Sequence, residues 1–569
     1  MKRKFGGRHN SCPNSPTFRK YSVALARALA LHYKDQKNIV AWHVSNEYGE
    51  ACYCENCEKA FRVWLRKRYG TLENLNYAWN TRFWGHTFYE WDEIVAPNLL
   101  SEHFEENRSM FQGITLDYKR FNSDGMLQNF RDEYQAIKEI IPDAKITTNF
   151  MGTYKPLDYK SWAPYLDMIS WDNYPEKDAE PAKVAMNHDL IRGLKGGMPF
   201  MLMEQTPSVS NWLADNGLKR PGVMRLQSYQ AVAHGADTVM FFQMRRSPGA
   251  CEKFHGAVID HAGREDTRVF RECAALGKEL EQLGGATLGT RTYAKAAILF
   301  DWPTWWALEC SAGPSTRMKY LDEILNYYRA FYEMNISVDF VGTDDDISGY
   351  QFVAAPLCYM VKEGLDEKLR AYAKEGGSLL FTYMSGYVNE SDYITVGGYP
   401  GKLKDLCGIW VEEIDALSVD ESNSFVYNGV TYPAELLCDL LHCEGAEELA
   451  SYQADFYQGM PVVTKNRFGK GTVYYVGTRS NPEFYRTLIT DICKEQGISP
   501  VLENAHGLEI TERENENQKY IFVLNHQKEK TGTIVLPWDA TELLGQNVYK
   551  KQTEISVKPR EVLIFQVDK

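Results

Sequence analysis

The alternation of apolar and polar positions divides the chain into regions of different character. Up to about residue 285, short apolar runs alternate with stretches of helical periodicity. Runs that are apolar on both faces are typical of parallel strands covered by crossover helices. A closed (β/α)8 barrel needs eight such strands. Residues 1–285 are therefore expected to form an N-terminally incomplete α/β barrel that holds strands four to eight, with strands near residues 39, 145, 168, 200 and 237.

Two further regions follow the glycine pair at residues 284 and 285. Between residues 290 and 498 apolar runs and helical stretches alternate again, which predicts a doubly wound open α/β sheet. This region has no glycine-rich phosphate loop and no obvious nucleophile elbow, and Cys358 is interpreted as a buried structural thiol rather than a nucleophile. From residue 501 to residue 569, short alternating runs separated by turns predict a small antiparallel β-sandwich.

Polar signals mark the ends of the first helices. Ser15 and Pro16 form a helix start, with serine as the N-cap and proline at the first helical position, and this helix is expected to reach about Tyr33. A second helix over residues 57–69 is expected to end at Gly70.

The most informative stretch is Ile39-Val-Ala-Trp-His-Val-Ser-Asn-Glu47, an apolar run that stops at an amide and an acid. A second run, Pro199-Phe-Met-Leu-Met-Glu204, ends in the same way. Chemistry in α/β barrels occurs at the carboxyl ends of the strands. A retaining glycosidase needs one carboxyl group to protonate the leaving oxygen and another to attack the anomeric carbon. We therefore expect Glu47 and Glu204 to face each other, although either could be an ordinary solvated or paired loop residue.

Three thiols lie within six residues, at Cys52, Cys54 and Cys57, and Cys12 precedes them by about 40 residues. Four thiolates make a closed tetrahedral site, which is the usual arrangement for structural zinc. The alternative is a set of unlinked core cysteines, but the surrounding stretch is polar. The cluster is therefore interpreted as a structural Zn2+ site with no catalytic role.

Other polar residues lie beside the predicted strand ends. Trp212, eight residues after Glu204, could stack on a sugar ring or simply anchor its loop. Asp172 and Tyr174 end the strand before Glu204 and could contact substrate or brace that acid. Arg8 and the stretch from Glu252 to His255 are surface residues if taken alone.

Composition narrows the class of protein. The 569 residues carry a formal net charge of −13, which argues against a nucleic-acid or anionic-membrane surface. The amino-terminal residues do not resemble a secretion signal, and no apolar run is long enough for a transmembrane helix. The twelve cysteines do not form a disulfide scaffold. These features favour a cytoplasmic protein.

Several motifs together resemble glycoside hydrolase family 42 β-galactosidases over nearly the whole chain. They are Gly-Arg-His-Asn-Ser-Cys-Pro-Asn-Ser-Pro, Trp-His-Val-Ser-Asn-Glu-Tyr-Gly, Cys-Tyr-Cys-Glu-Asn-Cys, Met-Glu-Gln-Thr-Pro with Asn211-Trp212, and Glu-Lys-Phe-His. The resemblance implies a TIM barrel, a flavodoxin- or amidotransferase-like trimerisation domain, a homotrimer and a terminal β-galactoside as substrate. It also implies roles for individual residues: Glu47 as proton donor, Glu204 as nucleophile, Arg8, Asn46, Trp212, Glu252 and His255 as galactose-binding residues, and Cys12, Cys52, Cys54 and Cys57 as zinc ligands.

The same resemblance accounts for the low strand count, because the family normally has about a hundred residues before the arginine-containing loop. The expected reaction is retaining exo-hydrolysis, with Glu47 protonated near neutral pH and Glu204 ionised. Two alternatives remain open. One is a truncated fragment with only an oligomerising or weak sugar-binding role. The other is an α-L-arabinopyranosidase, since arabinopyranose differs from galactose only at the exocyclic carbon.

Overall fold

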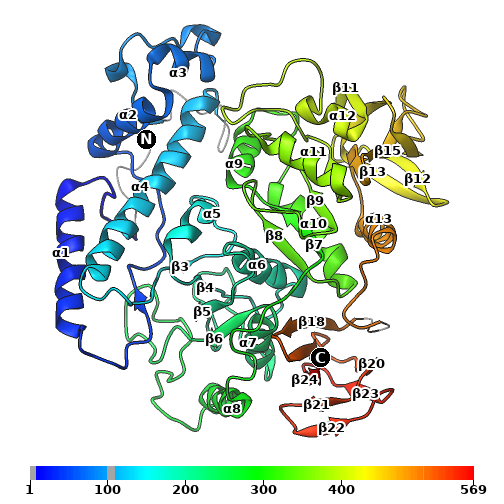
Figure 1. Ribbon diagram of the computed structural model, residues 1–569. Coiled ribbons are helices and arrows are strands. Elements are labelled where there is room, and N and C mark those ends of the chain that lie inside the picture. Colours follow the sequence, from blue (N-terminus) through cyan, green and yellow to red (C-terminus); the bar gives the residue numbers. More distant parts are fainter. Residues whose placement is uncertain (1–7, 99–108, 504, 506) are drawn as a thin grey trace.

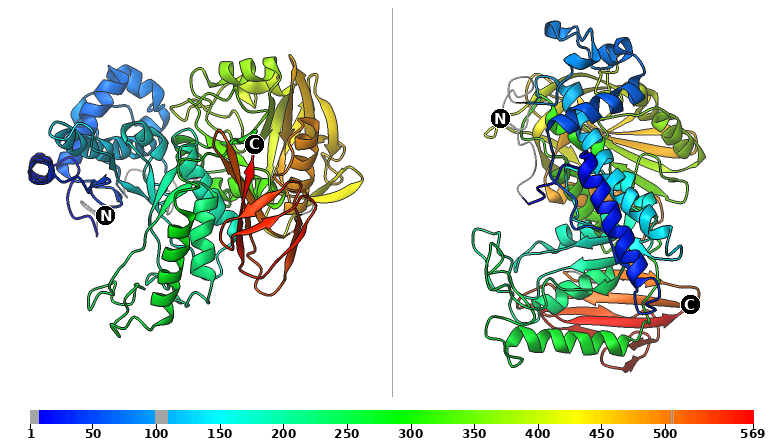
Figure 2. Two further views of the ribbon diagram at one scale, coloured as in Figure 1. Left: turned by 60° about the horizontal axis from the view of Figure 1, so that its bottom comes forward. Right: turned by 90° about the vertical axis from the view of Figure 1, so that its left-hand side faces the viewer.

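The computed structural model describes residues 8–98, 109–503, 505 and 507–569. Figure 1 shows a helical and parallel-strand region from the first half of the chain, a mixed α/β region beside its upper part, and a β region at the carboxyl end that lies below the α/β region and beside the lower part of the first region. The views in Figure 2 show the long helices α1 (Pro16–Tyr33) and α4 (Gln112–Lys138) side by side along one flank.

The first two helices are present and end where the sequence predicts, and the second begins two residues before the predicted start. The Ser15 side chain caps α1 by accepting a hydrogen bond from the Phe18 amide at 3.3 Å. Helix α2 (Glu55–Tyr69) stops at Gly70, whose φ of +75° suits a residue without a side chain. Both helices are therefore confirmed.

All five predicted barrel strands are present and pair in parallel in the described residues. The run near residue 145 is divided into two short strands by Thr148. Pairing runs from β1 to β2 and then from β3 through β4 and β5 to β6, so these strands form an open arc within the described part of the chain. Their bounds are β1 (Trp42–His43), β2 (Ile146–Thr147), β3 (Asn149–Phe150), β4 (Ser170–Asp172), β5 (Phe200–Glu204) and β6 (Ala236–Val239).

The prediction that the first strand is buried on both faces is wrong for its start. Only Trp42 and His43 are in strand pairing, and Val40 is 82% exposed. Among the described residues β1 has β2 as its single neighbour, so nothing covers the other side of this run. Val44, which follows the paired residues, is buried as expected.

The remaining helices of the first region cover the arc and extend beyond it. They are α3 (Leu72–Ala78), α5 (Tyr159–Trp162), α6 (Pro181–Gly193), α7 (Val223–Ala233) and α8 (Arg268–Leu283), with three single 3-10 turns at Phe83–Gly85, Trp91–Glu93 and Ala163–Tyr165. No helix of the described residues is both long and apolar enough to span a bilayer.

The second region contains the predicted open α/β sheet, with seven strands in the order β14-β15-β16-β10-β9-β7-β8. Its central strands are parallel, whereas β14 and β15 add an antiparallel edge. The strands are β7 (Ala296–Leu299), β8 (Val338–Val341), β9 (Phe352–Ala355), β10 (Ser378–Thr382), β14 (Glu447–Ser451), β15 (Pro461–Phe468) and β16 (Gly471–Val476). The helices are α9 (Trp302–Cys310), α10 (Tyr320–Glu333), α11 (Leu365–Glu375), α12 (Lys404–Cys407) and α13 (Pro482–Glu495), with a 3-10 turn at Gly401–Leu403.

A second, antiparallel sheet in this region was not predicted. It is built around the long strand β13 (Val430–Cys443), flanked by β11 (Ile409–Ala416) and β12 (Asn423–Tyr427), and β17 (Thr478–Arg479) also pairs with it. Two buried indoles of α9 tie the α/β region to the loop after β3 of the first region. For example, the Trp302 indole donates to the Tyr154 carbonyl at 3.0 Å, so the two regions share one apolar core.

The carboxyl-terminal region is antiparallel, as predicted. One sheet has the order β18-β19-β24-β21-β22, and a second contains β20 and β23. The strands are β18 (Glu509–Glu514), β19 (Gln518–Leu524), β20 (Gly532–Val535), β21 (Ala540–Glu542), β22 (Asn547–Tyr549), β23 (Glu554–Val557) and β24 (Val562–Asp568). Apolar side chains of β19 and β24 pack against α7 and α8, which fixes this region to the barrel.

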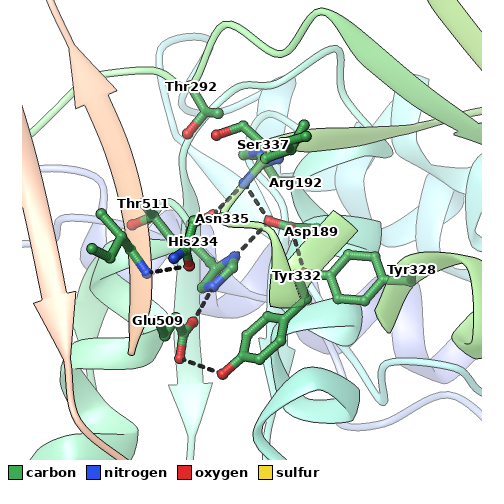
Figure 3. A pocket seen from close by; sticks show the side chains of 12 residues that line it. Asp189, Arg192, His234, Thr292, Tyr328, Tyr332, Asn335, Ser337, Glu509 and Thr511 are labelled. Atoms are coloured by element: carbon green, nitrogen blue, oxygen red, sulfur yellow. Dashed lines mark hydrogen bonds and ion pairs between the residues drawn. The ribbon is translucent and has the colours of Figure 1, made fainter. Parts of the chain in front are cut away.

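A buried cluster of charged residues lies where the three regions meet (Figure 3). Asp189 and Arg192 come from α6, His234 follows α7, Asp339 lies on β8 and Glu509 on β18. The His234 ring is 2.7 Å from Asp189 through Nδ1 and 2.6 Å from Glu509 through Nε2. Arg192 pairs with Asp189 and with Asp339. Each acid in this junction cluster therefore has a basic partner.

Candidate active site

Three carboxyl groups converge at the carboxyl ends of the barrel strands. Glu47 follows β1, Asp172 ends β4 and Glu204 ends β5. One carboxyl oxygen from each lies within 4.8 Å of the others. Because strands β4 and β5 pair with Asp172 opposite Glu204, the sheet register itself brings these two acids together. The structure therefore brings together the two glutamates that the sequence singled out, and it adds a third acid.

The backbone after β1 turns sharply to present Glu47. Ser45 and Glu47 both have positive φ values, +59° and +45°, in the left-handed region that side chains other than glycine seldom adopt. The Glu47 amide donates to the Asn149 side-chain oxygen at 2.7 Å, which holds this turn against β3. Glu47 is 8% exposed. Strain of this kind persists where surrounding contacts over-determine the conformation, and it is common at functional sites.

Glu204 is held by a phenol. The Tyr174 hydroxyl donates to Glu204 Oε2, and this tyrosine lies two residues beyond Asp172. Burial raises the pKa of Glu204, and the nearby Glu47 charge adds to the rise, while the hydrogen bond from Tyr174 opposes it. Burial therefore outweighs the phenol's hydrogen bond, and the pKa of Glu204 lies above its ordinary value.

Arg8 and Asn46 lie beside Glu47. The Arg8 guanidinium forms an ion pair with Glu47 Oε2, and the Arg8 backbone amide donates to Glu50 at 3.3 Å. The Asn46 side-chain oxygen accepts from the Asn149 amide group at 3.0 Å. Arg8 remains more than half exposed, so its charge is partly screened by water.

An aromatic wall stands beside Glu204. The Trp212 and His255 rings are stacked with centroids 5.3 Å apart, and Tyr174 meets both edge-on. Trp212 is 56% exposed and so offers a free ring face, whereas His255 is fully buried. Glu252 is near enough to raise the pKa of Glu204. All five residues expected to bind the sugar therefore border the carboxyl cluster or its aromatic wall.

The four predicted thiols also converge. Sγ atoms of Cys12, Cys52, Cys54 and Cys57 lie within 4.8 Å of one another, and all four cysteines are free of disulfides. The distance is 3.4 Å from Cys12 to Cys57 and 3.9 Å from Cys54 to Cys57. A tetrahedron of thiolates with bonds of about 2.3 Å has edges of about 3.8 Å. The four residues therefore fit a tetrathiolate metal site.

Asn149 is the site residue that sequence reasoning missed. It is buried at the centre of the carboxyl cluster and contacts the loop after β1 as well as Asp172. The signal was available in the polar run Thr147-Thr148-Asn149 at a strand end, but the strand was interpreted only as a structural element.

The arrangement suits glycosyl transfer to a carboxylate. Carboxyl groups about 5–5.5 Å apart leave room for a sugar bonded to one of them and no room for an interposed water, which inverting enzymes need. A ring face, a buried imidazole and a guanidinium surround these groups and can orient a polar ring such as a sugar.

Comparisons with known proteins agree along the whole chain. The family profile described as "Beta-galactosidase", that of glycoside hydrolase family 42, matches residues 1–283. The profiles for the "Beta-galactosidase trimerisation domain" and the "Beta-galactosidase C-terminal domain" match residues 294–499 and 507–566.

Individual relatives are similar over almost all of this chain. The β-galactosidase BgaP of a Planococcus species is 54% identical over 98% of this chain and 83% of its own length. The β-galactosidase LacZ of Lactobacillus acidophilus is 48% identical over 92% of this chain and 79% of its own length. The crystal structure of a β-galactosidase from Bacillus circulans sp. alkalophilus superposes with a TM-score of 0.97 at 53% identity, covering 99% of this chain and 84% of that one.

The fold is therefore that of these relatives: a TIM barrel, a trimerisation domain and a carboxyl-terminal β domain. The comparisons do not support the expectation that this barrel domain is N-terminally incomplete.

Proposed function

This chain belongs to the glycoside hydrolase family 42 β-galactosidases, and we propose that it removes terminal β-D-galactosyl residues through Glu47 and Glu204. The family and the 54% identity to a β-galactosidase establish a retaining glycosidase. The observation that best supports the assignment of roles is the approach of the Glu47 and Glu204 carboxyl oxygens to within 4.8 Å.

The reaction has two steps. In the first, Glu204 attacks the anomeric carbon while Glu47 gives its proton to the departing oxygen, so the glycosidic bond breaks and a galactosyl ester forms on Glu204. In the second, Glu47 takes a proton from water, the water oxygen attacks the same carbon, and Glu204 leaves as a carboxylate. Asn46 and Arg8 are proposed to hold the sugar's hydroxyl groups, Trp212 to stack on its ring, and Glu252 and His255 to bind its far edge.

Replacing the nucleophile tests this assignment. Glu204→Ala is expected to lower kcat by at least about 10⁴-fold, because no ester can form. Sodium azide should partly restore turnover and yield galactosyl azide of inverted configuration, since the small anion fits the vacated space. Activity close to that of the parent enzyme would end the assignment. Nitrophenyl galactoside and nitrophenyl arabinopyranoside, compared on the parent enzyme, show which sugar is preferred.

The four-cysteine cluster is proposed to hold one structural Zn2+. The ion would supply no chemistry to the reaction, because four thiolates leave no open position. Cys52→Ser is expected to lower both the zinc content per chain and the midpoint of thermal unfolding, whereas Cys273→Ser, a thiol outside the cluster, should change neither. A chelator that stops activity while circular dichroism stays unchanged would contradict a structural role.

The chain is proposed to assemble as a homotrimer. The profile name for residues 294–499 supports this state. Light scattering during size-exclusion chromatography should then give about three times the chain mass of 65.3 kDa. A mass of one chain at micromolar concentration would contradict the proposal.

A further inference from the structure

Asn149 links the ends of three barrel strands with a single amide group. Its oxygen accepts from the Glu47 backbone amide at 2.7 Å, and its nitrogen donates to the Asn46 oxygen at 3.0 Å and to Asp172 Oδ2 at 2.5 Å. The side chain is 1% exposed. Because a backbone amide can only donate, the oxygen of Asn149 must face Glu47 and its nitrogen must face Asp172. The direction of each hydrogen bond is thereby fixed.

The fixed direction bears on where Asp172 carries a proton. Asp172 Oδ2 accepts a hydrogen bond from the Asn149 amide, and a carbonyl-type oxygen accepts better than a hydroxyl, so this contact favours Oδ1 as the protonated oxygen. The other oxygen, Oδ1, is buried and has no hydrogen-bond partner among the described residues. Asp172 is 6% exposed, and its nearest charged groups are the carboxyls of Glu47 and Glu204. An ionised Asp172 would place a second negative charge beside Glu204, or beside Glu47 once that acid has given up its proton, and would leave Oδ1 buried with no donor among the described residues. Such a buried charge is costly.

We propose that Asp172 keeps its proton on Oδ1 and donates it as a hydrogen bond to the Glu47 carboxyl group, as a positioning residue for the acid/base. The proposal rests on the proposed function, in which Glu47 gives its proton to the leaving oxygen. When that proton leaves, the Asp172 hydroxyl stabilises the new Glu47 carboxylate without adding charge beside Glu204. The Asp172 proton itself stays on Asp172 through both steps.

The electrostatics of the site agree with this geometry. Burial, together with the charges of Glu204 and Glu47, raises the pKa of Asp172 to about 10. A carboxylic acid held neutral by its surroundings so that it can donate a hydrogen bond is a known catalytic device. Asn149 acts as the second positioning residue, since its hydrogen bond to Oδ2 favours Oδ1 as the oxygen that carries the proton.

The neutral mimic Asp172→Asn tests the proposal. The carbonyl oxygen of the new amide can accept from Asn149, and its nitrogen can donate to Glu47, as the protonated acid does. We expect kcat/KM of Asp172→Asn to remain within about 5-fold of the parent. Asp172→Ala removes the donor and should lower kcat/KM by about 100-fold, as for loss of one donor to a developing anion.

A leaving-group comparison tells an effect on Glu47 from a general loss of structure. The dinitrophenolate of dinitrophenyl galactoside departs with little help from an acid, whereas the glucose of lactose needs a proton to depart. Asp172→Ala should therefore be slowed by about 10-fold more on lactose than on dinitrophenyl galactoside. The alkaline limb of its kcat/KM profile should also move, whereas that of Asp172→Asn should stay in place.

Ser170→Ala is a matched control on the same strand. Ser170 is fully buried and lies two residues before Asp172, with hydrogen bonds to Thr147 Oγ1 at 2.9 Å and to the Thr148 carbonyl at 3.0 Å. This variant should lower the unfolding temperature and leave unchanged the ratio of kcat/KM on lactose to kcat/KM on dinitrophenyl galactoside. If Ser170→Ala also slows lactose more than dinitrophenyl galactoside, the difference between the substrates reports strand packing alone, and the proposal is overturned.

Two results overturn the inference while the proposed function stands. One is a folded Asp172→Asn that is as slow as Asp172→Ala, since a charged carboxylate would then be required. The other is an equal loss on both substrates, which would place the effect of Asp172 on Glu204 or on the sugar. An active Glu204→Ala would instead remove the proposed function, and with it any acid/base for Asp172 to position. If Asp172→Ala does not fold, the conservative Asp172→Asn still decides the question.

Discussion

The carboxyl cluster at the active site and the junction cluster between the three regions bury similar groups in opposite arrangements. At the active site Glu47, Asp172 and Glu204 lie together, and the nearest guanidinium, that of Arg8, is more than half exposed. At the junction Glu509 is 3% exposed and contacts the rings of both His234 and His526.

The difference appears in the pKa values. Burial and like charges raise the pKa of Asp172 to about 10. At the junction burial also opposes ionisation, but His526 and His234 outweigh it and hold the pKa of Glu509 well below its usual range. The active site therefore favours a neutral, protonated acid beside the reacting carboxyl groups, whereas the junction keeps fixed charges that join three parts of the chain.

The largest expected effect comes from neutralising the acid of the junction. Glu509→Gln removes the carboxylate that His526 contacts and leaves His234 with Asp189 alone, and the free energy of unfolding in urea should fall by about 3–5 kcal/mol. In the folded protein kcat should stay within about twofold of the parent. The matched change at the active site, Glu204→Gln, should leave the free energy of unfolding unchanged or raise it while activity is lost. A loss of stability of the same size at both sites would remove the distinction.

The pH dependence of stability should separate the two clusters next. Burial lowers the pKa of His234, but Asp189 and Glu509 raise it to about 9, so its contribution is complete below about pH 6.5 and is lost as the pH rises to 9. Glu509, whose folded pKa is lowered, contributes above its ordinary pKa of 4.5 and loses this contribution in acid. The junction is therefore most stabilising between about pH 4.5 and 6.5.

The contribution of Asp172 to stability changes with pH in the opposite direction to that of an ordinary ion-paired acid. Because its folded pKa is raised, it favours folding most below its ordinary pKa of 3.8, and this advantage is lost as the pH rises toward 10. Between pH 7 and 9 the unfolding free energy of Asp172→Asn should fall about 1.4 kcal/mol less per pH unit than that of the parent. Urea titrations at three pH values measure the slope, and parallel slopes would count against a protonated Asp172.

The smallest effect is expected at the rim of the junction. Arg329 pairs with Glu180 at 2.7 Å, but the Glu180 side chain is 42% exposed. Arg329→Ala should therefore change the free energy of unfolding by less than about 1 kcal/mol, and added salt should reduce the difference further. An effect as large as that of Glu509→Gln would show that charge matters here regardless of burial.

Local patterns were enough to predict much of the fold. The cap at Ser15, the stop at Gly70 and the alternation of strands and helices depend on neighbours in the chain, so they could be read in order. The thiols and the two glutamates were also recognisable, because each stands at a strand end or in a short motif. The sheet around β13 was only partly beyond local patterns: β11 and β17 pair with β13 from farther along the chain, but β12 and β13 form a hairpin whose Asn428-Gly429 turn was a local signal that was overlooked.

The sequence by itself determined the residue types at the catalytic edge and the family to which the chain belongs. The tertiary structure alone decided which groups surround each acid. Asp172 lies opposite Glu204, Asn149 hydrogen-bonds to one oxygen of Asp172, and Glu509 contacts His234 from a position 275 residues away in the chain. Proton affinity depends on burial and on the nearest charges in space, and neither quantity is a property of position along the chain.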